Sequence, residues 1–229
     1  MSPFKLMLSA AVVMLLAVGG AGAAQPAKAK AATTFIGTLP AEPPARVAIV
    51  VEGDTFLAYA CGQTDDFNKV ASAWFKGTVK NGRIEATEDG KTLSAALADG
   101  TVRGSLTAAG KERGFTAKPV APTAIAGLYR ATKDVKGDPL VLGWIVDAKH
   151  QVVGGCQGKK REPIALQPAK PLPPPPPPAE EPQPEEKQQA EESLIGQFEE
   201  EPGVKVQGEK VTSAVKPPAG KIVRAQKKK

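Results

Sequence analysis

The sequence predicts an all-β protein, an antiparallel meander of about nine or ten strands followed by a disordered tail rich in proline, glutamate and lysine. Three observations predict this architecture: regularly spaced turn dipeptides, apolar residues that alternate with polar ones between the turns, and a sharp change of composition after residue 157. Antiparallel strands of this kind close into a barrel or stack as a two-layer sandwich, and both arrangements stay open at this point.

The turn dipeptides lie at nearly even intervals in the first half of the chain. They are Asn81-Gly82, Asp89-Gly90, Asp99-Gly100 and Ala109-Gly110. Asn-Gly and Asp-Gly suit the positive φ angles of two-residue hairpin turns, and a spacing of roughly 8–12 residues is typical of an antiparallel meander. The series therefore predicts consecutive hairpins.

The remaining strand boundaries follow from turn and breaker residues. Glu52-Gly53-Asp54 has the composition of a hairpin turn, whereas Pro119 and Pro122 end the meander because proline cannot donate to a neighbouring strand. The expected strands are 33–39, 47–51, 55–61, 71–79, 83–87, 91–97, 101–107, 113–117, 127–131 and 140–146, followed by a short last run at 151–156. No segment has a convincing helical pattern.

Side-chain alternation predicts which faces are buried. The strands between the turn dipeptides carry small apolar residues at every second position, so they bury one face. The runs 47–51, 56–61 and 140–146 are apolar at almost every position, which indicates cover on both faces. In a barrel of about eight strands, small inward residues allow either a filled core or a hollow for one small ligand.

Trp74 is the candidate ligand-binding residue. It alternates with Phe75, so we expect its side chain to point away from the barrel interior, toward solvent or a partner. A β-bulge near Lys69 and Val70 would shift this register. Two interpretations stay open: a tryptophan shielded by a loop, or an aromatic platform for a small apolar ligand.

Residues 1–24 have the features of a cleaved signal peptide. Lys5 precedes an apolar run, and the small residues Ala21-Gly22-Ala23-Ala24 provide a cleavage site. The apolar run of about 13 residues is short against the ~20 that cross a bilayer. We therefore expect export to the periplasm or the cell exterior, a short linker at 25–32, and no transmembrane segment after cleavage.

Export makes Cys61 and Cys156 candidates for a disulfide bond. The bond would join the first and last parts of the meander and restrict the unfolded chain by up to ~4.7 kcal/mol in the loop-entropy model. A redox or metal-binding pair is the alternative, but the chain has no C-x-x-C motif and its one histidine is His150. We expect a structural disulfide and no metal site.

Groupings of catalytic residues are nearly absent from the sequence. One histidine beside Lys149 gives no arrangement for a triad. The adjacent acids Asp65-Asp66 are more typical of a solvated turn or a helix cap than of glycoside chemistry. Gly154-Gly155 lacks the following helix of a phosphate-binding loop. We therefore expect a protein that is not an enzyme and uses no cofactor.

Residues 158–229 form the expected disordered tail. Prolines fill 173–178, nine acids and one base lie in 180–201, and eight bases and one acid lie in 203–229. The tail is either a solvated spacer or a basic end that contacts an anionic envelope polymer or an envelope protein; nucleic acid is not expected as a partner. The candidate partner-binding residues are Leu194, Ile195, Phe198, Lys227, Lys228 and Lys229.

The string VAIVVEGDTFLAYACG, with AWFKGTV, AGLYR and GWIVDAKHQVVGG, resembles secreted or surface-exposed β-meander modules of bacterial proteins. The resemblance spans 47–155, implies an envelope or extracellular setting, and implies no activity. We therefore expect an exported structural or interaction protein of the bacterial cell envelope, whose β domain, 33–157, is presented on a proline-rich spacer. A small apolar ligand-binding barrel and an inhibitor of a secreted hydrolase are the alternatives.

Overall fold

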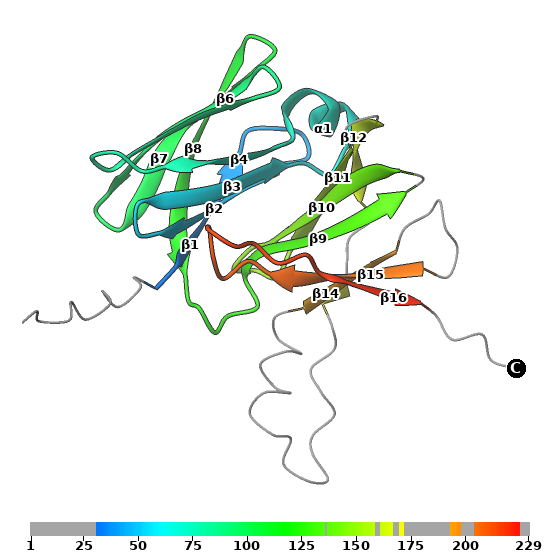
Figure 1. The fold of residues 1–229 in the computed structure, drawn as a ribbon. Helices are drawn as coiled ribbons and strands as arrows, with labels where there is room; N and C mark the ends of the chain where they lie inside the picture. Colours follow the sequence, from blue (N-terminus) through cyan, green and yellow to red (C-terminus); the bar gives the residue numbers. More distant parts are fainter. Residues whose placement is uncertain are drawn as a thin grey trace, which may run out of the picture.

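The computed structural model describes residues 31–135, 137–158, 161–166, 170–171, 193–197 and 204–224. The all-β prediction is confirmed, because two antiparallel sheets make up nearly all of the regular structure (Figure 1). The strands of the first sheet are β1 (Thr33–Leu39), β2 (Ala45–Glu52), β3 (Thr55–Cys61), β4 (Ala73–Thr78), β5 (Arg83–Glu88), β6 (Lys91–Ala98), β7 (Thr101–Ala108) and β8 (Lys111–Val120).

The first sheet curls into a nearly closed barrel. Its strand order is β4-β3-β2-β1-β8-β7-β6-β5, so β1 pairs with its sequence neighbour β2 on one side and with β8 on the other. The two end strands, β4 and β5, lie next to each other. The curvature thus brings both ends of the sheet together, as the barrel prediction required.

The turn dipeptides form the predicted hairpins. Both residues of each dipeptide have positive φ, from 51° and 72° at Asn81 and Gly82 to 48° and 71° at Ala109 and Gly110. Strand pairing then begins directly beside each turn, for example between Glu88 and Lys91. Because the turns fix the register, alternate side chains of β5 to β8 point into the barrel.

The interior-facing side chains form one packed apolar cluster. Phe35, Ile49, Phe75, Leu93 and Leu106 are among its buried members, each at most 5% exposed. The inward positions fit small residues closely: a Cβ atom at Gly104 would lie 2.2 Å from the carbonyl oxygen of Ser94.

One short helix, α1 (Asp65–Ala71), follows β3, so the expectation of no helix is wrong. Thr64 caps it by accepting a backbone N–H, and Asp65-Asp66 occupies the first turn, where acids favour the helix dipole. The buried Asn68 bonds to both the N–H and the carbonyl of Gly62, at 2.8 and 3.0 Å, and fixes the helix to the end of β3. No helix in the described residues is long and apolar enough to span a membrane.

The second sheet is built from later strands and packs against the barrel (Figure 1). Its strands are β9 (Gly127–Val135), β10 (Asp138–Val146), β11 (Val152–Gly158), β12 (Arg161–Leu166), β13 (Lys170–Pro171), β14 (Ser193–Gln197), β15 (Val204–Lys210) and β16 (Lys221–Arg224). The outer face of β2 and β3 meets this sheet through a cluster that includes Val50, Tyr59, Leu128 and Ile145. This contact explains why 47–51, 56–61 and 140–146 are apolar on both faces.

Part of the expected disordered tail belongs to the second sheet. β15 pairs with β9 through Glu209 opposite Arg130 and Lys210 opposite Tyr129, and Val211 is 1% exposed. Disorder from residue 158 onward is therefore a wrong expectation for 204–224, and the folded region extends past residue 157. The expected signal peptide, most of the linker and the proline run lie outside the described residues.

The predicted disulfide is wrong, because Cys61 and Cys156 are buried and both remain thiols. Cys61 lies between the two sheets, where its Sγ–H donates to the carbonyl of Val153 at 3.6 Å. Cys156 comes three residues later on β11, and successive side chains of a strand alternate between faces. It therefore points to the opposite face of the second sheet and packs in the cluster that contains Trp144.

Candidate functional site

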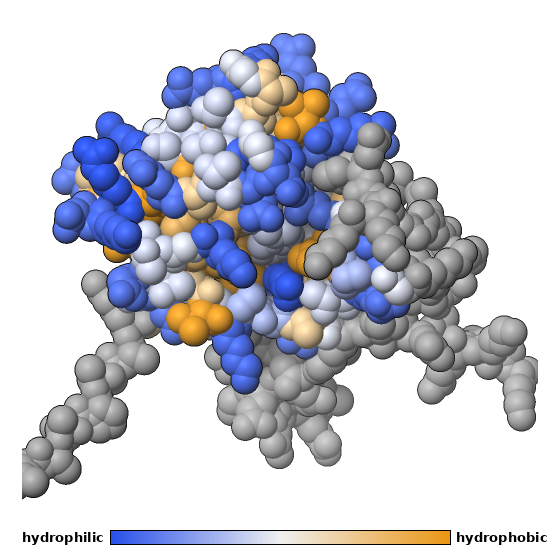
Figure 2. Space-filling model, turned by 45° about the horizontal axis from the view of Figure 1, so that its top comes forward, coloured by the Kyte–Doolittle hydropathy of each residue, from blue (hydrophilic) through white to orange (hydrophobic). Residues whose placement is uncertain are grey.

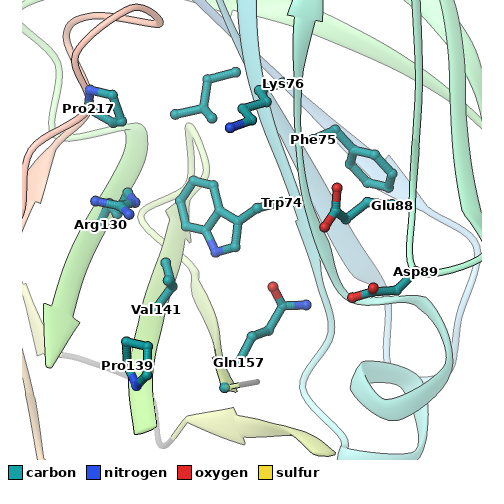
Figure 3. A pocket seen from close by; sticks show the side chains of 12 residues that line it. Trp74, Phe75, Lys76, Glu88, Asp89, Arg130, Pro139, Val141, Gln157 and Pro217 are labelled. Carbon is teal, nitrogen blue, oxygen red and sulfur yellow. The ribbon is translucent and has the colours of Figure 1, made fainter. Parts of the chain in front are cut away.

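A cleft of about 790 Å³ lies where the barrel wall meets the second sheet. The barrel contributes residues of β4, including Trp74 and Lys76, and the second sheet contributes Arg130 of β9 and Val141 of β10 (Figure 3). Pro217, which belongs to the expected tail, completes the lining. The site thus collects residues that are more than 140 positions apart in the sequence.

Trp74 occupies the centre of this cleft (Figure 3). Its ring stacks on Tyr59, with centroids 4.3 Å apart and planes inclined by 21°, and the guanidinium carbon of Arg130 lies 5.7 Å from its centroid. The prediction that Trp74 points away from the barrel interior is confirmed. The second sheet, rather than a loop alone, partly covers it.

The two aromatic rings fit against the second sheet because β10 has no side chain at the contact. A Cβ atom at Gly143 would lie 2.5 Å from Cε1 of Tyr59 and 2.7 Å from Cζ2 of Trp74. The Tyr59 hydroxyl accepts from Ser72 Oγ at 3.3 Å, and burial raises the pKa of this phenol well above its usual range. Tyr59 is therefore a neutral, fixed support for the Trp74 ring.

The indole Nε1–H of Trp74 is buried and has no acceptor among the described residues. In Figure 3 this nitrogen faces the part of the cleft between Val141 and Gln157. The Gln157 amide is held in place because it donates to the carbonyl of Ser72 at 2.7 Å. A buried donor without a partner costs roughly 1–3 kcal/mol, and a hydrogen-bond acceptor placed beside this nitrogen would remove that cost.

Arg130 is the half-buried cation of the cleft. Its Nη1 donates to the carbonyl of Pro218 at 2.7 Å, and no carboxylate in the described part of the chain pairs with it. Burial lowers the pKa of the guanidinium, yet arginine stays charged at neutral pH. A positive charge that forms no ion pair with a carboxylate of the described residues therefore lies beside an aromatic ring.

The segment 211–220 holds Pro217 and Pro218 at the cleft. Ser213 Oγ donates to the Glu52 carboxylate of β2 at 2.6 Å, and the N–H of Ala214 donates to the same oxygen at 3.0 Å. The bond from Ser213 is the largest influence on the pKa of Glu52; with the backbone bonds from this segment it outweighs burial and lowers the pKa below its ordinary value. These bonds attach the segment to the barrel.

The lining of the cleft provides an aromatic surface, Trp74, and a positive charge, Arg130, which suit binding rather than catalysis. Exposed acids, Glu88 and Asp89, lie on the barrel side of Trp74 in Figure 3, away from Arg130. In the described residues no three His, Cys, Asp or Glu side chains form a group that could hold a metal ion. The arrangement is chemically suited to bind a flat molecule that carries a polar group.

Of the partner-binding candidates, Leu194 and Ile195 lie in β14, which pairs with β15. Phe198, Lys227, Lys228 and Lys229 lie outside the described residues. Arg130 was not predicted from the sequence, although one signal was present: it is in phase with the buried Leu128 on the barrel-facing side of β9.

No family model matches this chain, and no curated protein matches it. One similar solved structure is that of a Nitrosomonas europaea protein provisionally assigned as AttH; it is 8% identical, with 78% of this chain and 79% of that chain covered and a TM-score of 0.24. A likeness of this size supports no conclusion about fold or function.

Proposed function

We propose that this chain is an exported, non-catalytic binding protein that holds a small ligand in the cleft beside Trp74. The observation that supports this function is the placement of Trp74, a partly exposed ring at the centre of a cleft of about 790 Å³. Small-molecule sites typically have volumes of roughly 300–1,000 Å³, apolar walls and a few polar groups.

The walls of the cleft favour a flat ligand with an apolar body. Leu57, Pro139, Val141 and Pro217 surround the Trp74 ring, and stacking on an aromatic face adds to the free energy of apolar burial. Compared with the ligand-binding barrel considered from the sequence, the proposed site lies on the outside of the barrel. The barrel interior instead supports the strand that carries Trp74.

The described surface offers no comparable apolar site for a partner protein. Its exposed large apolar side chains are Val70 and Val215, and the face in Figure 2 is mainly hydrophilic. The basic tail is in part structural: the Lys210 ammonium donates to the carbonyls of Pro122 and Ala124 at 2.7 and 2.5 Å. An envelope setting stays within the proposal, but the geometry favours ligand binding over anchoring.

Titration with N-phenyl-1-naphthylamine, an uncharged dye that fluoresces in apolar sites, tests this function. We expect saturable binding of one dye per chain, and Trp74→Leu should weaken it at least about tenfold because the stacking surface is lost. Phe67→Leu removes a ring from α1, outside the cleft, and should bind as the unaltered protein does.

Thermal melting followed by circular dichroism verifies that both variants are folded. Equal dye affinity in the Trp74 and Phe67 variants would place the site elsewhere. Absence of saturable binding to the unaltered protein would contradict a cleft that accepts a flat apolar body.

A further inference from the structure

The charge state of Arg130 assigns a chemical class to the ligand. We propose that the cleft binds an oxyanion attached to a flat apolar body, and that the negative group pairs with the guanidinium of Arg130. This inference rests on the proposed binding function and adds the class of ligand to it.

Another arginine of this protein shows how a buried cation is usually paired with a carboxylate. Arg46 is 8% exposed, and its Nη2 lies 2.9 Å from the Asp147 carboxylate, which also accepts from its Nε at 3.3 Å. Charges removed from water are normally paired in this way. Arg130 is half-buried but has only the carbonyl of Pro218 as an acceptor among the described residues.

The guanidinium of Arg130 keeps donors for a ligand. It has five N–H groups, and one nitrogen bonds to Pro218 at 2.7 Å. The planar arrangement of the remaining N–H groups matches the two oxygens of a carboxylate, phosphate or sulfonate. The bond to Pro218 also restrains the side chain, so less conformational entropy is lost when an anion binds.

The acids that line the cleft do not neutralise Arg130. Glu88 at the end of β5 and Asp89 in the β5–β6 turn are exposed and lie across Trp74 from Arg130 in Figure 3. No ion pair of the described residues joins Arg130 to either of these acids or to Glu209, its register partner on β15. Lys76 on β4 adds a second positive charge to the lining. An anion therefore meets attraction at the end of the cleft formed by Arg130.

The position of Trp74 determines which chemical group must be attached to the anion of the ligand. The Arg130 guanidinium carbon is 5.7 Å from the ring centroid, so a ligand whose oxyanion bonds to Arg130 places its next atoms beside the indole. Pro139, Val141 and Pro217 are the apolar residues labelled on that side of the cleft (Figure 3). The fitting ligands are aromatic or similarly flat carboxylates and phosphate esters.

A matched pair of dyes isolates the contribution of the charge. 1-Anilinonaphthalene-8-sulfonate has the same aromatic body as N-phenyl-1-naphthylamine and carries a sulfonate in addition. We expect the unaltered full chain to bind the sulfonate dye about tenfold more tightly, the effect of a typical hydrogen bond to a charged group. Arg130→Gln should abolish this preference, so that the two dyes bind the variant with affinities within about twofold of each other.

Two further variants keep the result interpretable. Arg103→Gln removes an exposed arginine from the outer face of β7, far from the cleft lining, and should preserve the preference for the sulfonate dye. Arg130→Lys keeps the charge and should retain part of the preference. If Arg130→Gln loses both dyes because the segment 211–220 is displaced, the absence of any preference in Arg130→Lys would overturn the inference.

The outcomes separate this inference from the binding function. If the neutral dye binds in a Trp74-dependent manner and the sulfonate dye binds no more tightly, the anion assignment is wrong and the binding function stands. If neither dye depends on Trp74, the binding function fails. Displacement by 1-naphthoate or 1-naphthyl phosphate, compared with uncharged 1-naphthol, then distinguishes a carboxylate from a phosphate ligand, and equal displacement by all three overturns the assignment.

Discussion

The carboxylate of Asp147, in the turn after β10, shows how single residues join the two sheets. Its Oδ2 lies 2.9 Å from Nη2 of Arg46 on β2, and its Oδ1 accepts from the N–H groups of Lys149 and Gln151 at 2.8 and 2.9 Å. Burial of the carboxyl favours a higher pKa, but the bonds from Gln151, Arg46 and Lys149 outweigh it, and the pKa of Asp147 is lowered.

A lowered pKa stabilises the folded state in a defined pH range. The contribution is present above the unfolded pKa of about 4 and is lost as the pH falls through the folded value. Asp147→Asn should lower the free energy of unfolding at pH 7 by about 1–3 kcal/mol, since it leaves Arg46 without its counter-ion. Urea unfolding at pH 7 and pH 3 measures this loss, which should shrink at pH 3.

The control for this prediction is the exposed Glu112. Glu112→Gln should change the free energy of unfolding at pH 7 by less than ~0.5 kcal/mol. If Asp147→Asn retained the full pH dependence, the ion pair between the sheets would contribute nothing to stability.

The four turn dipeptides between β4 and β8 share a backbone conformation but not a residue type. Asn81, Asp89 and Asp99 have side chains that favour positive φ, whereas Ala109 adopts φ of 48° without such a side chain. Ala109→Asn should therefore raise the free energy of unfolding by ~0.5–1 kcal/mol, and Asp99→Ala should lower it by a similar amount. Urea unfolding of both variants tests the pair, and a destabilising Ala109→Asn would show that the turn is held by other contacts.

The elements that sequence patterns predict well are those with local rules. β1 and β3 begin and end at the expected residues, because turn dipeptides and period-two alternation act within one hairpin. The seven-residue helix α1 is too short for a clear helical period. β15 lies in a charged segment whose partner, β9, is far away in the sequence, so its composition resembled that of a disordered chain.

At the scale of the whole molecule, the stacking of the two sheets keeps the two cysteines on different faces of the second sheet. Cys61 belongs to the layer between the barrel and the second sheet, whereas Cys156 packs on the far face of that second sheet. We expect the intact mass of protein purified under nonreducing conditions to correspond to two thiols. Alkylation should reach both after denaturation and proceed slowly before it, because both side chains are at most 4% exposed. A mass smaller by two hydrogens would indicate a disulfide bond and would contradict the placement of Cys156 on the far face of β11.

The same stacking explains why the sequence predicts only one residue of the candidate site. Alternation indicated that Trp74 points away from the barrel and that three runs are covered on both faces. Alternation does not reveal which face of the barrel packs against which face of the second sheet, because that packing depends on contacts between distant segments. Arg130 and Pro217 therefore meet Trp74 only in the folded molecule.

The bond between Arg130 and Pro218 makes occupancy of the cleft and docking of the segment 211–220 thermodynamically linked. A ligand that contacts both Arg130 and Pro217 binds the docked arrangement in preference to an undocked one, so its free energy of binding also secures the segment. At a ligand concentration of 100 times Kd this contribution reaches about 2.7 kcal/mol if the ligand binds the docked arrangement alone. A ligand that occupied the cleft would thus stabilise the docked position of the segment 211–220 against the barrel.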